Sequence, residues 1–421
     1  MTQKRPVLVI VCGYSSGAFL AQEFDKLGFD CIHITLNRLA SLKAFRINQN
    51  DYIAELIVED ETKIEDCIKK LQTYHPTGII AGCECGVLLA DMIAAHFDVY
   101  KNESEISLAR RDKYYMIEQL RKQGLTAQKQ IKTNILSDIF EWQKQCQLDR
   151  IVLKPLKSAV SDNVYYCTTQ RETEAVFQSI LNEPTVYNEV NTEVLAQEFI
   201  DGTEYIVNAF SFNGKHQIID IWQGVNNTPD LVSNDLYADL IGQSEAVHQK
   251  LGNYTKEVLT ALGVKYGASH SEIRINSRGI PYLIECGVRL SGRIYSPVLE
   301  KLYGESQYSL LLKMYTDPNV ICEFLKRPLS PTHKARYVYF KSNIDGLIKE
   351  DVNLASFYQI PSLVYVDLPL KKGDWLHKTC KVKKIHRPGF AYLLASTEEK
   401  IERDYHKLIE LEQKTYEDII R

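Results

Sequence analysis

The chain has 421 residues, of which 45% are hydrophobic and 25% are charged, and its formal net charge is −4. This composition is typical of a soluble globular protein with two to three domains, at about 150 residues per domain. The weakly acidic charge gives no reason to expect nucleic acid or an anionic membrane as a partner, and no apolar run approaches the roughly 18 residues that cross a bilayer.

The ten cysteines are scattered through the chain and form no C-x-x-C pair. Cys83 and Cys85 lie close together in "GCECG" but have no partner cluster, so neither a zinc site nor a disulfide framework is supported. The N-terminal stretch "MTQKRPVLVIVCGYSSG" lacks a small-residue cleavage site and breaks at glycine as a strand would. We therefore expect a reducing, cytoplasmic location for this chain.

Strands alternate with helices in the first 100 residues. Apolar runs are predicted as strands at 6–12, 30–35, 52–59 and 77–82, and a helical pattern lies at 62–74. This order predicts a parallel, doubly wound sheet. The turn "GYSSG" after the first run is not G-x-G-x-x-G, so we interpret it as a strand-to-helix turn at a ligand crevice rather than a dinucleotide fingerprint.

Glu84 follows the fourth predicted strand and precedes a helical run. Ligands of open α/β sheets bind beyond the carboxyl ends of the strands, which makes Glu84 a candidate substrate residue. An acid at a helix start is also stabilised by the helix dipole without any ligand. The sequence leaves both interpretations open.

The middle of the chain changes character. Its predicted elements are an amphipathic helix at 106–125, a strand ending in Lys-Pro at 150–155, a small polar loop at 157–163, antiparallel strands within 193–224, an irregular loop at 225–242 and a helix at 243–263. A hairpin at 266–287 turns at residues 277–279, short strands follow from about residue 331, and a charged helix closes the chain near 396–420.

Two carboxylates mark the hairpin. A turn centred near Gly279 places Glu272 and Glu285 almost opposite each other, where two like charges destabilise paired strands. A divalent cation between them removes this penalty, and Mg²⁺ favours one or two carboxylates plus substrate phosphates. The hairpin therefore predicts a magnesium site, although Mn²⁺ could take its place.

Arg289 lies four residues after Glu285, among small residues. A lone acid and base at this spacing could be a solvated surface pair worth under about 1 kcal/mol. Beside a metal, the same guanidinium could hold an oxyanion or a carboxylate in a bidentate manner. His270 alternates onto the face of Glu272, and either a substrate role or a packed, hydrogen-bonded role fits it.

Upstream segments supply groups that a nucleotide needs. Lys113 and Lys154 each offer a point charge for phosphate, although either alone could be a surface cation. The loop 157–163 offers the hydroxyls of Ser158 and Ser161 and its backbone N–H groups.

In this order, the segments resemble the ATP-grasp superfamily, and the resemblance covers most of the chain. The motifs that carry it are "RDKYYM", the Lys-Pro strand, the small-residue loop, the E-F-I-x-G-x-E hinge and "GASHSEIRIN…IPYLIECGVRLSG". Within the superfamily, G-x-x-H-x-E followed by I-E-x-x-x-R-L-x-G most resembles the L-amino-acid ligases, which are dipeptide synthetases.

The resemblance implies an α/β fold of ATP-grasp architecture, with an N-terminal Rossmann-like parallel sheet domain, central ATP-grasp α+β domains and a C-terminal β-rich extension. The domains expected are an N-terminal domain at 1–104, a linking helix and small subdomain at 105–192, a large subdomain with the metal hairpin at 193–325, and a β-rich subdomain with a terminal helix at 326–421.

The resemblance also implies a role for each candidate residue. Lys113 and Lys154 bind the phosphates of ATP, Glu272 and Glu285 hold magnesium, and Arg289 steadies an acyl-phosphate and a tetrahedral intermediate. The hinge residues implied in nucleotide binding are Glu198, Phe199 and Ile200 along adenine and Glu204 at the ribose.

Two segments depart from the superfamily pattern. Val160 and Asn163 stand in the phosphate loop where glycines are expected, so the backbone should approach phosphate less closely. Gly287 stands where many relatives have an asparagine, so one metal ion would be held more loosely or through water.

We therefore expect an ATP-dependent carboxylate–amine ligase that joins two L-amino acids through an acyl-phosphate and releases ADP and phosphate. Its expected partners are ATP and amino acids, with no nucleic acid or membrane, and a homodimer is compatible with the sequence. Two alternatives stay open. One is an ATP-grasp ligase or carboxylase for another carboxylic acid, and the other is a nucleotide-binding regulatory protein without catalysis.

Overall fold

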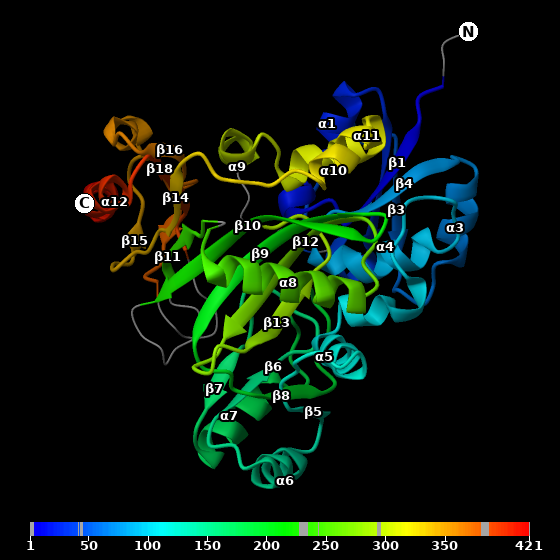
Figure 1. The fold of residues 1–421 in the computed structure, drawn as a ribbon, viewed down its shortest axis with the longest axis horizontal. Helices are drawn as coiled ribbons and strands as arrows, with labels where there is room; N and C mark the ends of the chain where they lie inside the picture. The colour runs from blue at the N-terminus through cyan, green and yellow to red at the C-terminus, as the bar shows by residue number, and fades with distance from the viewer. Residues whose placement is uncertain are drawn as a thin grey trace.

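Four parallel strands form the N-terminal sheet of the computed structural model (Figure 1). In order across the sheet they are β3 (Ala54–Val58), β2 (Asp30–Leu36), β1 (Val7–Val11) and β4 (Pro76–Ala81). The helices of this region are α1 (Leu20–Lys26), α2 (Asn37–Ala40), α3 (Glu65–Gln72) and α4 (Val87–Ala94). All five residues of β1 are buried, as expected for the central strand of a sheet covered on both faces.

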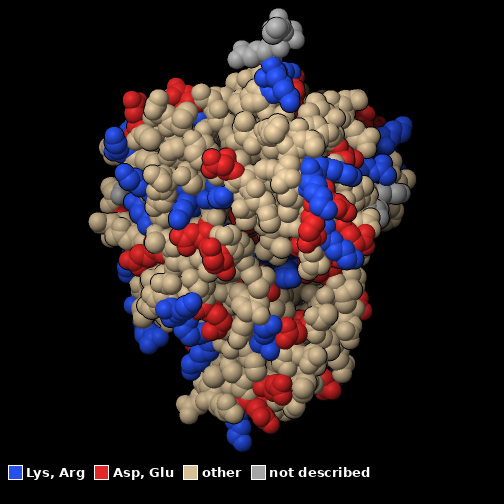
Figure 2. Space-filling view, turned by 90° about the vertical axis from the view of Figure 1, so that its right-hand side faces the viewer, with Lys and Arg blue, Asp and Glu red and all other residues tan. Residues whose placement is uncertain are grey.

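The structure describes residues 4–40, 42, 45–226, 235–242, 244–292, 296–379 and 387–420. Within these ranges, no helix is long and apolar enough to span a membrane. On the face drawn in Figure 2, acidic and basic side chains are interspersed.

A small antiparallel sheet forms a separate layer at the bottom of Figure 1. Its strands, in order, are β5 (Gln130–Thr133), β8 (Val194–Glu198), β6 (Ile151–Lys154) and β7 (Tyr165–Cys167). Two helices accompany it, α6 (Leu136–Cys146) and α7 (Gln170–Ile180). Helix α7 begins at a capping box, in which Thr169 and Glu172 each satisfy a backbone N–H of the other.

The largest sheet has eight antiparallel strands and carries the hairpin. In order they are β13 (Pro281–Gly287), β12 (Gly267–Ile275), β9 (Thr203–Phe212), β10 (Lys215–Asn226), β11 (Asp235–Leu240), β14 (Lys334–Tyr339), β18 (Phe390–Ala395) and β16 (Leu363–Asp367). Strands β14, β18 and β16, which follow residue 330, thus extend this eight-stranded sheet. Two short strands, β15 (Gly346–Leu347) and β17 (Trp375–Leu376), pair in a separate two-stranded sheet.

The prediction of an irregular loop at 225–242 is wrong at both ends, since residues 225 and 226 still belong to β10. Residues 235–240 form β11, which pairs with β10 on one side and β14 on the other. Strand β14 lies about 100 residues further along the chain, so the local sequence could not show that residues 235–240 pair with it as a strand. Residues 227–234 of the expected loop lie outside the described residues.

The remaining helices are α5 (Lys113–Lys122), α8 (Ala246–Ala261), α9 (Ser296–Tyr303), α10 (Gln307–Thr316), α11 (Pro318–Phe324) and α12 (Glu398–Ile420). The helix expected at 106–125 is divided into a 3-10 segment (Ser104–Arg110) and α5. Asp112 makes the division, because its carboxylate accepts hydrogen bonds from the backbone N–H of Tyr114 and Tyr115 and caps α5. Lys113 is consequently the first residue of a helix.

The hairpin has the predicted register. Gly279 adopts a φ of +77° in the turn, which a residue without a Cβ accepts at no steric cost. Glu272 on β12 pairs directly with Glu285 on β13, after a register shift between Glu272 and Ile273. The pairing of the two strands therefore places the two carboxylates next to each other.

Candidate active site

One cavity of about 280 Å³ lies where the three sheets meet. Its walls come from the carboxyl end of the N-terminal sheet, from the small sheet with its loop, and from β12, β13 and the residues after them. Every residue predicted from the sequence lines it: Glu84, Lys113, Lys154, Ser158, Ser161, Glu198, Phe199, Ile200, Glu204, His270, Glu272, Glu285 and Arg289. The structure therefore assembles the whole predicted set in one place, while the individual roles stay predictions.

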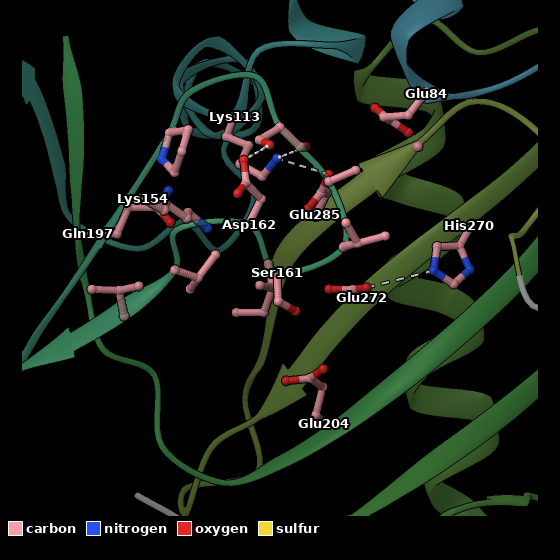
Figure 3. A pocket seen from close by; sticks show the side chains of 18 of the residues that line it. Glu84, Lys113, Lys154, Ser161, Asp162, Gln197, Glu204, His270, Glu272 and Glu285 are labelled. Atoms are coloured by element: carbon pink, nitrogen blue, oxygen red, sulfur yellow. Dashed lines mark hydrogen bonds and ion pairs between the residues drawn. The ribbon is translucent and has the colours of Figure 1, made fainter. Parts of the chain in front are cut away.

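Glu272 and Glu285 project into the middle of this cavity (Figure 3). Lys113 Nζ lies 3.0 Å from Glu285 Oε1 and donates a hydrogen bond to the backbone oxygen of Ser158. His270 Nε2 lies 3.8 Å from Glu272 Oε1. Each of the two facing carboxylates thus has a nitrogen-bearing side chain beside it.

Burial and neighbouring charges shift the pKa values of Lys154 and Glu285. Burial, and then the neighbouring charge of Lys113, lowers the pKa of Lys154 to about 8. Burial alone would raise the pKa of the Glu285 carboxyl, but Lys113 and Lys154 outweigh it and the net shift is downward. A polyphosphate entering this region would meet two buried ammonium groups, which are costly to leave without an anion.

The carboxylate pair also fits a magnesium ion. Across the ranges that the structure describes, no cluster of three or more His, Cys, Asp or Glu side chains could hold a metal by itself. Two facing carboxylates supply the incomplete set that Mg²⁺ accepts when phosphate oxygens and water fill the other positions. The residues present therefore suit a metal that arrives with a nucleotide.

The far end of the cavity is organised by Arg274, which sequence analysis missed. Its guanidinium donates two hydrogen bonds to Glu204 Oε2, at 3.0 and 2.9 Å, and one to the backbone oxygen of Ile200 at 3.1 Å. It also lies 5.6 Å from the centre of the Phe199 ring. Arg274 thereby fixes the hinge predicted to meet adenine and ribose. Strand alternation from His270 and Glu272 could have found it.

The phosphate loop adopts left-handed backbone conformations without glycine. The φ angles of Val160, Ser161 and Asn163 are 53°, 57° and 52°. The geometry that glycines usually permit is thus retained, at a steric cost that is greatest for the β-branched valine. Asp162, also missed from the sequence, accepts hydrogen bonds from Ser158 Oγ at 2.7 Å and from the Val186 backbone N–H at 3.1 Å.

Glu84 and Arg289 form an ion pair in the opposite wall, with Arg289 Nε 3.0 Å from Glu84 Oε2. Both side chains are largely buried, at 5% and 15% exposure. Burial lowers the pKa of the Arg289 guanidinium, but the charges of Glu84, Tyr187 and Glu285 together outweigh burial and the net shift is upward. Arg289 is therefore buried and paired with Glu84, and does not form with Glu285 the solvated surface pair that the local sequence allowed.

Gly287 makes room for this pair. A Cβ built at Gly287 would lie 2.5 Å from Glu84 Oε2 and 3.1 Å from Arg289 Cζ. An asparagine side chain there, as in many relatives of the superfamily, would collide with the carboxylate. The departure from the usual pattern thus has a local steric reason.

Comparison with known proteins identifies the family of this chain. Residues 149–296 match the family described as the ATP-grasp domain. Dapdiamide A synthase of Enterobacter agglomerans is 30% identical over 395 residues, which cover 91% of each chain. The chain belongs to the ATP-grasp superfamily.

Solved structures share the fold of this ATP-grasp protein. The L-amino acid ligase from Bacillus licheniformis has a TM-score of 0.76 at 18% identity, over 97% of this chain and 98% of that one. N5-carboxyaminoimidazole synthase from Aspergillus clavatus, in complex with ADP and 5-aminoimidazole ribonucleotide, has a TM-score of 0.67 at 13% identity, over 98% and 99%. The predicted fold class and the resemblance to L-amino-acid ligases are confirmed, and the chain is an ATP-grasp ligase.

Proposed function

We propose that this ATP-grasp ligase joins the carboxylate of one L-amino acid to the amine of a second, through an acyl-phosphate, and releases ADP and phosphate. The observation that carries the proposal is the buried Glu84–Arg289 pair at one end of the cavity that holds Glu272 and Glu285.

An α-amino acid is complementary to this ion pair. Its carboxylate can meet the guanidinium of Arg289, and its α-ammonium group can meet the carboxylate of Glu84, because a zwitterion matches two fixed opposite charges about 3 Å apart. An acid without an amino group satisfies only Arg289. The pair therefore favours amino acids as the activated substrate.

The nucleotide would lie along the rest of the cavity. Glu204 lies at the end opposite Glu84 in Figure 3, and Glu272 and Glu285 lie between. ATP stretched this way would present its γ-phosphate near the carboxylates and Arg289, beside the acid. Lys113 and Lys154 would neutralise phosphate oxygens, and Glu272 and Glu285 would hold Mg²⁺, which when bound neutralises charge on the transferring phosphoryl group.

The reaction proceeds in two steps. A carboxylate oxygen of the first amino acid attacks the γ-phosphorus, the bond to the ADP oxygen breaks, and ADP leaves. The neutral amine of the second amino acid then attacks the carbonyl carbon, phosphate leaves, and the amine nitrogen loses a proton. Arg289 lies beside the carbonyl oxygen, where a fixed positive charge stabilises the oxyanion that develops.

The relatives support amide formation in a general way. The names of dapdiamide A synthase and L-amino acid ligase both point to amide products, whereas the name of N5-carboxyaminoimidazole synthase points to a different product. The alternative of an acid that is not an amino acid therefore has a structural precedent in the fold, and the charge pair is what distinguishes the two proposals here.

The test is an incubation with ATP, magnesium and each of the twenty amino acids, alone and in pairs, followed by chromatography of nucleotides and mass spectrometry of products. ADP, orthophosphate and an amide should form only with suitable amino acids. AMP as the main product would contradict the mechanism. ADP release with simple carboxylic acids but no amino acid would favour the alternative ligase, and no release with any acid would favour a regulatory protein.

A variant sharpens this test. Glu84→Gln keeps the shape of the side chain but removes the charge that would bind an ammonium group. Turnover of amino acids should fall, while ATP affinity stays unchanged. Equal turnover by the variant and the parent protein would mean that Glu84 does not recognise the ammonium group.

A further inference from the structure

A row of three polar residues leads from the interior of the large sheet to the cavity. Asn208 on β9 pairs with His270 on β12 on one side and with Asp220 on β10 on the other. The three residues are thus neighbours across adjacent strands. Asp220 is 0% exposed and Asn208 is 3% exposed, whereas His270 lines the cavity.

Hydrogen bonds join the row from end to end. Asn208 Nδ2 donates to Asp220 Oδ1 at 2.5 Å, and Trp222 Nε1 donates to the same oxygen at 2.6 Å. The amide oxygen of Asn208 lies 2.9 Å from His270 Nδ1.

The direction of these bonds determines which histidine nitrogen carries hydrogen. Asp220 Oδ1 accepts from both Asn208 Nδ2 and Trp222 Nε1, so the NH₂ group of the Asn208 amide faces Asp220. The amide oxygen must then face His270, and because that oxygen only accepts, His270 Nδ1 must be the donor. Nδ1 is therefore protonated in both the neutral and the charged ring.

Asp220 otherwise has an unfavourable position. Burial raises its pKa to about 7, although the hydrogen bonds from Asn208 and Trp222 favour the ionised form. Among the described residues, no group hydrogen-bonds its second oxygen, Oδ2. A buried carboxylate costs stability, which a protein accepts more readily when the group orients a functional side chain.

We propose that Asp220 and Asn208 are positioning residues that hold His270 with Nδ1 protonated and Nε2 directed into the cavity, where Nε2 accepts a hydrogen bond from the amine of the second substrate. Nε2 lies on the side of Glu272, next to the carboxylates that surround the reacting groups (Figure 3). The amine would be held with its lone pair turned away from the histidine and toward the carbonyl carbon. This substrate assignment rests on the proposed function, whereas the tautomer does not.

The tautomer can be measured without turnover. Protein labelled with ¹⁵N-histidine gives separate shifts for protonated and unprotonated ring nitrogens, and the signals of His270 are identified by their loss in His270→Gln. We expect a protonated Nδ1 in the parent protein. Asp220→Leu frees the Asn208 amide to rotate, so the Nδ1–H preference should be lost. An unchanged tautomer in this variant would overturn the proposal.

Two further variants guard against a folding defect. Asp220→Asn retains an oxygen that can accept from Asn208 and Trp222, so it should keep the tautomer. Ser211→Ala is the matched control, because Ser211 is also buried on β9 and hydrogen-bonds a histidine ring, Nδ1 of His216 at 2.8 Å, outside the cavity. This control should leave both the His270 tautomer and the activity unchanged.

Kinetics then test the substrate assignment. With the best amino acid pair, Asp220→Leu should lower kcat/KM for the amine substrate about 10- to 100-fold, as is usual when the group that orients a histidine is removed. The KM for ATP should not change. A tautomer change with unchanged amine kinetics would overturn the role of Nε2. If the parent protein forms no amide at all, the proposed function fails, and the tautomer result stands separately.

Discussion

Glu84 Oε2 lies 3.0 Å from Arg289 Nε, although 205 residues separate the two in the chain. Glu84 follows the last strand of the N-terminal parallel sheet, and Arg289 follows β13 of the hairpin. The Glu84–Arg289 ion pair therefore links the end of the N-terminal sheet to the hairpin that carries Glu272 and Glu285. This is why an acid captured by the N-terminal region could be presented to a nucleotide bound between the other two sheets.

Gly287→Ala tests whether the spacing of this pair matters. The new Cβ would approach Glu84 Oε2 to 2.5 Å, and because that oxygen ends a flexible side chain, Glu84 should move and the protein should still fold. We expect kcat/KM for the activated amino acid to fall about tenfold, equivalent to about 1.4 kcal/mol, with unchanged ATP affinity.

Gly242→Ala serves as the control for this substitution, since the nearest atom to its Cβ would be 3.5 Å away. Steady-state kinetics with each substrate varied in turn provide the measurement. If Gly287→Ala had the same amino-acid kinetics as the parent protein, the exact position of the Glu84–Arg289 pair would not matter for turnover.

Arg289→Lys keeps the positive charge but loses the planar fork of the guanidinium. If Arg289 faces the oxyanion, the rate should fall by a factor on the order of 10² to 10³, as when an oxyanion donor is deleted. Single-turnover amide formation at saturating ATP measures this step. Arg121→Lys, at a helix surface beside Glu118, is the control and should be neutral. A parent-like rate in Arg289→Lys would remove the oxyanion role.

Nucleotide affinity should depend on the charge of Lys154. Burial, followed by repulsion from Lys113, lowers the pKa of Lys154 to about 8 in the free protein, and bound phosphate would raise it again. Since the protonated form binds phosphate, affinity is fully present below about pH 8 and should weaken above it, by up to about tenfold per pH unit.

Calorimetric titration with ADP between about pH 7.5 and 9.5 would show this decline together with proton uptake on binding. Lys154→Arg should abolish the pH dependence, because arginine stays charged throughout this range. A parent protein with pH-independent ADP affinity would show that Lys154 does not pair with phosphate.

Much of this site was predictable because it depends on local order. Strand alternation and the turn at Gly279 predict Glu272 and Glu285 nearly opposite each other, and a register shift between Glu272 and Ile273, which the sequence does not show, completes the pairing. Glu84 and Arg289 were each recognisable as candidates in the sequence. Their pairing was not predictable, because nothing in the local sequence shows that these two distant strand ends meet. The bond between Asn208 and His270 was hidden for the same reason, since it depends on the pairing of β9 with β12.

The substitution Val160→Gly, in the predicted phosphate loop, should stabilise the folded protein. Val160 has a φ of 53° and is 75% exposed, so its side chain contributes strain and little burial. A non-glycine residue in the left-handed region costs about 1–3 kcal/mol, and glycine gives back up to about 1 kcal/mol in chain entropy. The free energy of unfolding should therefore rise by about 1 kcal/mol.

Chemical denaturation of the parent and the variant measures this difference. Val164→Gly, in the same loop region but without a left-handed φ, should be destabilising instead. A loss of stability in Val160→Gly would mean that the left-handed conformation of this loop is not the conformation in solution.

The metal assignment makes the most discriminating prediction, through Glu285→Gln. The substitution removes the carboxylate 3.0 Å from Lys113 Nζ, so the phosphate end of the cavity becomes more positive by one charge. ATP without magnesium should then bind at least as tightly as to the parent protein. Turnover should nevertheless fall by a factor on the order of 10² or more, since a metal contributes several kcal/mol of charge stabilisation.

These opposite effects distinguish a metal ligand from a structural acid. If Glu285 only anchored Lys113, its loss would impair folding and ATP binding together, as breaking a buried pair usually does. Glu193→Gln is the matched control, because Glu193 pairs with Lys132 at 2.7 Å outside the cavity. Nucleotide titration with and without magnesium, and turnover at saturating magnesium, decide the question. Parent-like turnover in Glu285→Gln would eliminate Glu285 as a ligand, because an amide cannot supply the charge that the metal requires.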